Sequence, residues 1–186
     1  MPGSHGYCGS CADDDPVDAT LALGDYTAPF DRLILRLKFG ARLPAAGWIA
    51  AQLAARMRAT GTLPDLLLPV PLSARRLAER GFNQAWEVTR PLARHLSIPA
   101  SATLLVCHRE TASQRTLDLA ARLANLRDAF AVADIAGITD DRLLHGRHVG
   151  LVDDVMTSGA TLREAARVLK AHGAARVTAL TALRTP

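Results

Sequence analysis

The sequence lacks the features that would direct the chain to secretion or into a membrane. No apolar run reaches the length of a membrane-spanning helix, and the start of the chain lacks the charged and apolar regions of a signal peptide. Repeats, low-complexity tracts and long linkers are absent as well. We therefore expect a compact cytoplasmic protein without membrane insertion. Its 186 residues, 49% of them hydrophobic, suit one domain with a full core and a small appendage.

Cysteine is scarce, which limits the metal chemistry that the chain can support. Cys8 and Cys11 form a C-x-x-C pair, but a structural zinc site needs four ligands. The nearest other candidates are His5 and the acids Asp13 to Asp15. The pair therefore indicates either part of a Zn²⁺ site, which binds only if further ligands complete it, or a leader with free thiols. Cys107 stands alone in an apolar run, as is typical of a small buried side chain.

Lysine is nearly absent although the chain is basic. Of its 22 basic residues only Lys38 and Lys170 are lysines, the net charge is +4 and the sequence pI is near 9.4. Arginine matches the geometry of phosphate groups better than lysine does. The bias indicates either binding of phosphate or nucleic acid, or a genome rich in G and C.

The most informative stretch runs from His148 to Gly173. A short apolar segment, Val149 to Val152, predicts a buried strand, and two acids, Asp153 and Asp154, follow it directly. After two apolar residues comes a small, hydroxyl-rich turn, and then apolar residues at helical spacing. The residues of the turn are Thr157, Ser158, Gly159, Ala160 and Thr161.

The start of a helix favours an anion, because its first N–H groups have no partners within the helix and carry part of the helix dipole. A phosphate bound at the turn would accept these N–H groups and the nearby hydroxyls, and Gly159 would let it approach the backbone. Asp153 and Asp154 would repel a phosphate, so we expect them to accept hydrogen bonds from sugar hydroxyls and to hold Mg²⁺ through water. The alternative is that the acids merely cap the following helix.

The rest of the chain alternates between predicted strands and helices, which indicates an α/β fold with a parallel sheet. Two short helices come first, and Pro69 and Pro71 mark where the first strand leaves the sheet. The predicted helices are 30–40, 48–61, 84–96, 117–126 and 160–172, and the predicted strands are 62–70, 103–107, 148–152 and 176–183.

At this point the stretch around the two acids resembles the 5-phosphoribosyl 1-pyrophosphate (PRPP) motif of type I phosphoribosyltransferases. Two further blocks, Leu66 to Leu96 with P-V-P-L and R-G-F-N-Q, and His108 to Val132, are similar to the ComF family. Members of that family join a phosphoribosyltransferase-like domain to an N-terminal zinc ribbon. The first C-x-x-C of such a ribbon is missing here.

The resemblance implies a Rossmann-like type I phosphoribosyltransferase core with a small helical hood. We assign residues 1–25 to a leader with the remnant of a zinc ribbon, 26–62 to the hood and 63–186 to the core.

The resemblance also implies roles for arginines outside the motif. The turn after Pro71 resembles the pyrophosphate loop of this fold, which makes Arg75, Arg76 and Arg80 candidates for PRPP binding. For Arg75 and Arg76 the alternative is a solvated helix face. For Arg80, Gly81, Asn83 and Gln84, a structural and a substrate-side role are both open.

The polar stretch His108 to Arg115 follows a predicted strand and resembles the loop that closes over the sugar in type I phosphoribosyltransferases. Arg109 would then reach the pyrophosphate as a catalytic residue. A plain surface loop is the alternative.

One departure from related enzymes limits the acceptor. In 6-oxopurine phosphoribosyltransferases an Asp acting as general base follows the second acid by three positions, and here that position is Thr157. Those enzymes commonly carry Lys where this chain has Ala160. We therefore expect neither hypoxanthine nor guanine as acceptor, and nothing in the sequence identifies the acceptor.

Two functions follow from these residues and resemblances. One is a Mg²⁺-dependent enzyme that transfers the phosphoribosyl group of PRPP to an unidentified acceptor and releases pyrophosphate, with Asp153, Asp154 and Arg109 at the reacting centre. The other is a non-catalytic PRPP- or nucleotide-binding module that acts in competence and DNA uptake and binds single-stranded DNA through its arginines. A homodimer is compatible with either.

Overall fold

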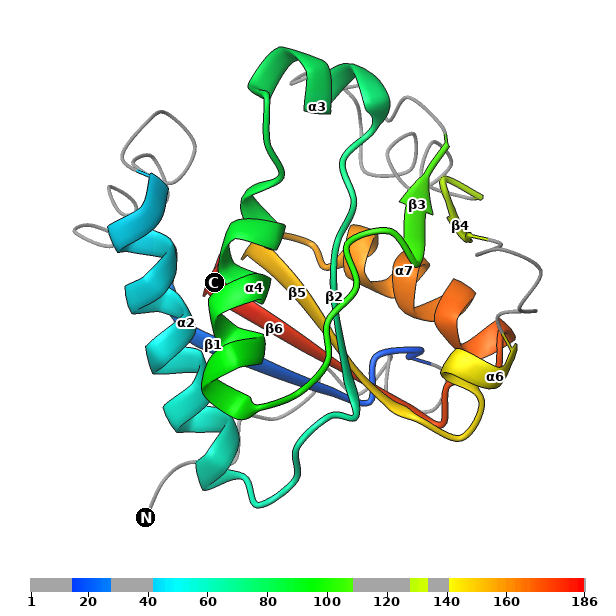
Figure 1. Ribbon diagram of the computed structural model, residues 1–186, viewed down its shortest axis with the longest axis horizontal. Coiled ribbons are helices and arrows are strands. Elements are labelled where there is room, and N and C mark those ends of the chain that lie inside the picture. The colour runs from blue at the N-terminus through cyan, green and yellow to red at the C-terminus, as the bar shows by residue number, and fades with distance from the viewer. Residues whose placement is uncertain (1–14, 28–41, 109–127, 134–140, 186) are drawn as a thin grey trace.

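The computed structural model of the chain describes residues 15–27, 42–108, 128–133 and 141–185. Within these residues, four parallel strands form a sheet (Figure 1). Its order is β1–β6–β5–β2, where β1 is Ala19–Asp25, β6 is Arg176–Arg184, β5 is His148–Met156 and β2 is Leu66–Pro69.

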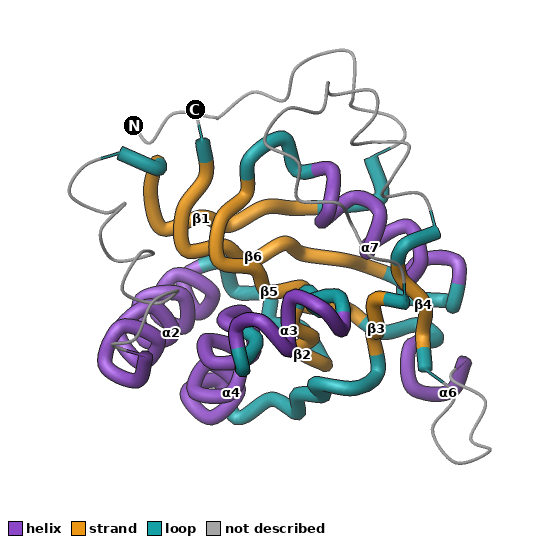
Figure 2. The backbone as a smooth tube through the Cα atoms, turned by 90° about the horizontal axis from the view of Figure 1, so that it is seen from above, coloured by secondary structure: helices purple, strands orange, loops and turns teal. Residues whose placement is uncertain are grey.

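The sheet is buried because helices cover both of its faces. Helices α2 (Arg42–Ala59) and α4 (Gln84–Leu96) pack together on one face, and α7 (Ala160–Ala171) covers the other (Figure 2). Side chains of the strands alternate between the two cores: Leu67 packs with α2 and α4, whereas Leu66 and Leu68 belong to the core beneath α7. Strands buried on both faces read as continuous apolar runs, which explains why β2 was recognisable from its sequence.

The remaining described elements are short. Helix α3 (Ala74–Arg80) stands beyond the end of β2 and contributes no buried residue. Strands β3 (Leu105–Cys107) and β4 (Phe130–Val132) form a separate antiparallel pair, and α6 (Asp141–Leu144) precedes β5. None of the helices in the described ranges is both long and apolar enough to cross a membrane.

The predicted α/β class with a parallel sheet is confirmed, and α4 has the predicted bounds. The predicted strand at 103–107 exists as β3, but it is not part of the parallel sheet, because its pairing partner is the antiparallel β4. Strand β2 covers only Leu66–Pro69 of the predicted 62–70. The helices predicted at 30–40 and 117–126 lie outside the described residues.

Two boundaries differ from the predicted domain assignment. Residues 19–25 are not leader, because they form β1 and pair in parallel with β6 from Ala19 opposite Thr178 to Asp25 opposite Arg184. Helix α2, assigned to the hood, packs against α4 and places Ile49 and Leu53 in the core. Strand β1 and helix α2, which both precede residue 62, therefore help to build the sheet and its cover.

Candidate functional site

The two acids lie inside the last part of β5, not after it. The strand continues through them because the parallel ladder with β6 continues, with Asp153 opposite Thr181 and Met156 opposite Arg184. Asp154 is buried, with 6% of its surface exposed, and Asp153 is partly exposed. The N-cap of α7 is Gly159, so neither acid caps that helix and the capping alternative fails.

The side chains of β5 on the two sides of the acid pair contact different cores. Val152 packs with α2 and α4, whereas Met156 packs with the core beneath α7. The ladder with β6 keeps one register throughout, from His148 opposite Arg176 to Met156 opposite Arg184. The carboxylate Oδ1 of Asp153 accepts a 2.8 Å hydrogen bond from the N–H of Asp154. The acids therefore lie between Val152 and Met156, whose side chains contact opposite cores.

The turn between β5 and α7 has the backbone expected of an anion site. Gly159 has a φ of 74°, in the left-handed region, and α7 begins at the next residue. Thr157 and Ser158 are exposed, Thr161 is partly exposed, and Ala160 donates from its N–H to Ser158 Oγ at 3.5 Å. Hydroxyls and the first N–H groups of a twelve-residue helix therefore gather within five residues of chain.

The segment after β2 lies beside the acids because β2 and β5 are neighbours in the sheet. Pro69 is opposite Val152, and the N–H of Val70 donates to the carbonyl of Val152 at 2.8 Å. Ser73 is buried and caps α3, with its Oγ accepting from the N–H of Arg76. The tertiary structure thus brings together the two segments that the sequence predicted for the two ends of one substrate.

The three arginines expected in the pyrophosphate loop lie on α3. Arg75 is exposed and its Nε donates to Glu79 at 2.8 Å, which fits the solvated helix face that was its alternative. Arg76 and Arg80 are partly buried. Helix α3 has seven residues and stands at the carboxyl edge of the sheet.

Asn83 makes two hydrogen bonds to the backbone, as its structural alternative predicts. Its Oδ1 accepts from the N–H of Ala85 and caps α4, while its Nδ2 donates to the carbonyl of Val70 at 3.0 Å. The side chain thereby joins α4 to the end of β2. The next residue, Gln84, is 6% exposed, and its Oε1 has no hydrogen-bond partner among the described residues. A buried amide oxygen of this kind suits a group that binds there.

Several predicted residues cannot be placed. Arg109 and the rest of the expected closing loop after His108 lie outside the described residues, as do Cys8 and Cys11. Within the described ranges no group of three or more His, Cys, Asp or Glu side chains is arranged to hold a metal ion. The described Cys107 is only partly buried, whereas its apolar run predicted a buried side chain.

Sequence reasoning missed three residues that the structure brings to the site. Thr181 is fully buried opposite Asp153, and its hydroxyl has no hydrogen-bond partner among the described residues. Arg163 extends from α7 to the turn and to Asp15. A signal existed for Arg163, which lies four residues after Gly159 and therefore one helical turn from it. Nothing in the sequence marked Thr181, and Asp15 was marked only as a candidate zinc ligand.

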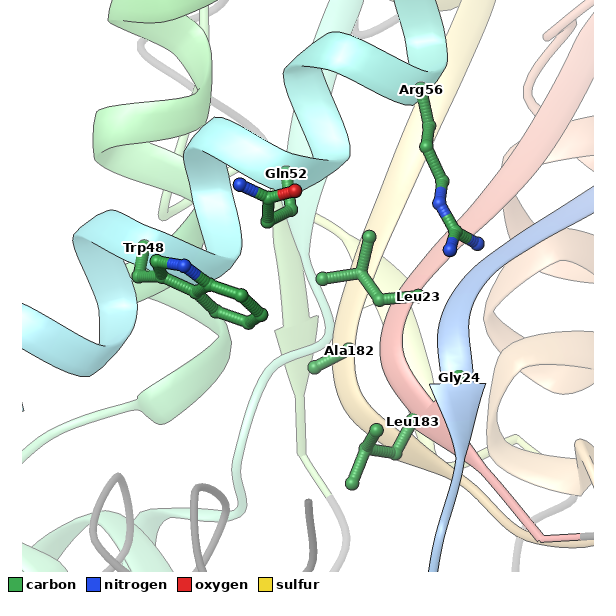
Figure 3. A pocket seen from close by; sticks show the side chains of 7 residues that line it. All are labelled: Leu23, Gly24, Trp48, Gln52, Arg56, Ala182 and Leu183. Carbon is green, nitrogen blue, oxygen red and sulfur yellow. The ribbon is translucent and has the colours of Figure 1, made fainter. Parts of the chain in front are cut away.

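A cavity of about 190 Å³ lies apart from the turn, between α2 and the strands β1 and β6 (Figure 3). Trp48, 47% exposed, and Gln52 approach it from α2, and the guanidinium of Arg56 donates to the carbonyl of Ala22 at its edge. The cavity contains none of the predicted site residues; it is lined by Leu23, Gly24, Trp48, Gln52, Arg56, Ala182 and Leu183.

The chain is similar to proteins of known families. The family model described as phosphoribosyl transferase domain matches residues 42–186. The DNA utilization protein YhgH of Escherichia coli strain K12 is 35% identical over 185 residues, which is 95% of this chain and 78% of the relative. Competence protein F of Haemophilus influenzae is 33% identical over 177 residues, covering 90% of this chain and 73% of the relative.

Similarity to solved structures is more distant. The adenine phosphoribosyltransferase of Leishmania donovani matches 89% of this chain and 83% of its own at 15% identity, with a TM-score of 0.48. The glutamine PRPP amidotransferase of B. subtilis matches 75% of this chain and 27% of its own, with a TM-score of 0.47 at 15% identity.

The family model covers β2, β5 and β6 together with the helices that pack on them, and therefore both segments that meet at the acids. The relatives extend the match toward β1, since they align with nearly the whole chain. The chain belongs to the phosphoribosyltransferase domain family, among the ComF-type proteins that include competence protein F and the DNA utilization proteins.

Proposed function

We propose that the protein binds PRPP across the carboxyl edge of β5 and β2. The observation that carries the proposal is the arrangement at the end of β5, where two acids precede a turn that opens α7 with Gly159 in the left-handed region. Anion-binding N–H groups and sugar-binding carboxylates then lie a few residues apart. Membership of the phosphoribosyltransferase domain family supports the same assignment.

The proposed orientation places each part of PRPP on a different segment. The 5-phosphate accepts from the N–H groups and hydroxyls of the turn from Thr157 to Thr161, and the ribose hydroxyls donate to Asp153 and Asp154. The pyrophosphate extends toward the segment after β2, where Ser73, Arg76 and Arg80 lie. This orientation follows from the neighbouring positions of β5 and β2 in the sheet.

The carboxylates also fit Mg²⁺, because hard oxygen ligands suit that ion. Asp153 is partly exposed and lies next to the proposed pyrophosphate position, so it would hold a hydrated ion more readily than the buried Asp154. When bound, Mg²⁺ would neutralise charge on the departing pyrophosphate.

In the enzymatic form of the proposal, an acceptor nitrogen forms a bond to the anomeric carbon of PRPP. The bond from that carbon to the pyrophosphate oxygen breaks, pyrophosphate leaves with the bonding electrons, and the acceptor loses a proton to water. The described site contributes binding and charge compensation to this step. Thr157 cannot act as the general base that an Asp provides in 6-oxopurine enzymes, so the acceptor is one whose proton leaves without that base.

A second candidate function is a PRPP-binding module that acts on DNA without transfer. The names of the relatives favour it, as does the distribution of charge. Helix α2 contains no acidic residue, and its Arg56 and Arg58 donate to backbone carbonyls, whereas Arg163 and Arg167 on α7 form ion pairs with carboxylates. The α2 face therefore offers positive charge to the phosphates of a single strand.

Calorimetry with PRPP and Mg²⁺ tests the binding site. Asp153→Asn with Asp154→Asn removes two charged acceptors of ribose hydroxyls, so affinity should fall by about tenfold or more. Asp128→Asn is the matched control, because Asp128 is an exposed acid that pairs with Arg167 beneath the same helix. Equal PRPP affinity of the double variant and the parent would refute the assignment.

A screen for pyrophosphate release separates the two candidate functions. Release with one nucleobase or amine, abolished by the double acid variant, supports transfer. PRPP binding without release from any acceptor supports the module.

Binding to single-stranded DNA should weaken steeply as salt rises if the α2 face carries it. Arg56→Gln with Arg58→Gln should then reduce that affinity, and Arg167→Gln should not. Salt-independent or absent binding would exclude the DNA role.

Three further expectations stay predictions. Metal analysis tests Zn²⁺ binding by Cys8 and Cys11, cell fractionation tests the cytoplasmic location, and sedimentation tests the homodimer.

A further inference from the structure

Arg163 occupies a position at the turn that the proposed binding of PRPP does not use. It lies in the first turn of α7, where its N–H donates to the carbonyl of Gly159 at 2.9 Å. Its guanidinium folds back, and Nη1 donates to the carbonyl of Ser158 at 2.7 Å. A β-carbon built on Gly159 would meet the same Nη1 at 3.2 Å, so the guanidinium lies directly against this glycine.

The geometry of the peptide bond determines where the N–H of Gly159 points when Arg163 binds the carbonyl of Ser158. In a trans peptide the carbonyl and the N–H of one unit point in opposite directions. The peptide between Ser158 and Gly159 has its carbonyl directed at the guanidinium, so its N–H points to the other side of the turn. A charged donor on the carbonyl also polarises the peptide and makes that N–H a stronger donor.

Asp15 holds the guanidinium in place from a distant part of the chain. Its Oδ2 accepts from Arg163 Nε at 3.0 Å, and its Oδ1 accepts from the N–H of Val17 at 3.0 Å. The Asp15 side chain is 17% exposed and that of Arg163 is 46% exposed, so the acid is the more buried partner of the pair. The segment before β1 thereby restrains Arg163, and Arg163 restrains the backbone at Ser158 and Gly159.

We propose that Arg163 is a positioning residue for the 5-phosphate, an inference that rests on the proposed function. It fixes the Ser158–Gly159 peptide with the Gly159 N–H directed at the phosphate, and Asp15 orients Arg163 for this task. Arg163 does not touch the phosphate. It acts through the backbone, so its loss weakens recognition of the 5-phosphate and leaves the pyrophosphate end of the site unchanged.

Two small probes separate these ends in calorimetry: ribose 5-phosphate for the turn and inorganic pyrophosphate for the segment after β2. Arg163→Met should bind ribose 5-phosphate about tenfold more weakly, the usual effect of losing one charge-assisted hydrogen bond, and should bind pyrophosphate as the parent does. Arg163→Lys keeps the charge but not the planar fork that reaches both Ser158 and Asp15, so it should also lose most of the affinity. Asp15→Asn should cause a smaller loss.

Arg167→Met is the matched control. Arg167 lies one helical turn after Arg163, carries the same charge and pairs with Glu164 and Asp128 away from the turn. Its removal should leave ribose 5-phosphate affinity unchanged. A similar loss in Arg167→Met would show an effect of charge alone, and full affinity in Arg163→Met would show that the effect is absent. Equal weakening of both probes would show general destabilisation. Each of these outcomes would overturn the proposal.

The amide signal of Gly159 in nuclear magnetic resonance gives a readout that needs no ligand. Arg163→Met should shift it, because the peptide loses its guanidinium partner, while Arg167→Met should leave it unchanged. An unmoved signal would overturn the proposal. Failure of the parent to bind either probe or PRPP would refute the proposed function instead, and this signal would still decide whether Arg163 orients the turn.

Discussion

Gly150 lies so close to Leu67 on the neighbouring strand that a β-carbon built on it would come within 2.5 Å of Leu67 Cδ2. The same β-carbon would meet Pro64 at 3.0 Å and Leu180 at 3.3 Å. The contact belongs to the core beneath α2 and α4. Gly150 lies on β5, four residues before Asp154. A glycine in the middle of a buried strand thus allows three apolar side chains to converge.

Gly150→Ala should lower the free energy of unfolding by about 1–3 kcal/mol, the usual cost of overpacking a core. Gly47→Ala is the control, because Gly47 lies inside α2 and a β-carbon there would meet nothing within 4 Å. That change should raise stability by about 0.5–1 kcal/mol, since alanine favours a helix. Urea unfolding measures both, and a Gly150→Ala variant as stable as the parent would show that Leu67 can move aside.

Gly159→Ala should destabilise the protein and weaken phosphate binding together. Its φ of 74° is unfavourable for alanine by about 1–2 kcal/mol. The added methyl would also press on the guanidinium of Arg163. Gly61→Ala has the same backbone strain at a φ of 72° with open space around it, so it should lose similar stability and keep ribose 5-phosphate affinity. Equal affinity in both variants would argue against a phosphate at the turn.

His148 should make stability fall as the solution becomes acidic. Burial and the nearby charge of Arg176 lower the pKa of His148 below 6.5, although the Leu63 carbonyl opposes them. The unfolded chain therefore takes up this proton at a higher pH than the folded protein does. The contribution of His148 to the free energy of unfolding is therefore full above about pH 6.5. It declines as the pH falls toward the folded pKa and does not change further below that pKa.

His148→Gln should flatten that decline, because glutamine does not titrate. The ring Nδ1 lies 3.2 Å from the Leu63 carbonyl and therefore donates to it, which leaves Nε2 to accept from the Thr178 hydroxyl at 2.8 Å. Urea unfolding of both proteins from pH 8 to pH 5 measures the difference. Parallel pH profiles would mean that another group causes the decline.

Asp18 should stabilise the fold at neutral pH, and this stabilisation should be lost in strong acid. Burial opposes its ionisation, but the Lys170 ammonium and the Val177 N–H outweigh burial and lower the pKa of Asp18 below 3.8. Its contribution is present above the unfolded pKa and is lost as the pH falls through the folded value. Asp18→Asn should therefore destabilise at pH 7 and lose less stability than the parent on further acidification. Asp25 is an exposed acid that pairs with Arg184. Asp25→Asn should therefore lower the free energy of unfolding at pH 7 by less than Asp18→Asn does.

Most of the confirmed predictions came from patterns of residues close together along the chain. Helix α4 begins at Gln84 and ends at Leu96 as predicted, because its apolar positions repeat at helical spacing and Asn83 caps it. The acids, the turn and α7 lie within one continuous stretch, so their order alone indicates the site. The end of β5 was misplaced at Val152, since polar side chains do not end a strand whose backbone still has a ladder partner.

The sequence by itself determined the family of the chain, the parallel α/β class and the position of the acid–turn–helix segment, because each depends on residues close together along the chain. Only the tertiary structure decided that β1 completes the sheet beside β6, that β3 pairs with β4 instead of the sheet, and that Asp15 meets Arg163 across 148 residues. Such pairings depend on which distant surfaces bury one another, and periodicity along the chain carries no information about the partner.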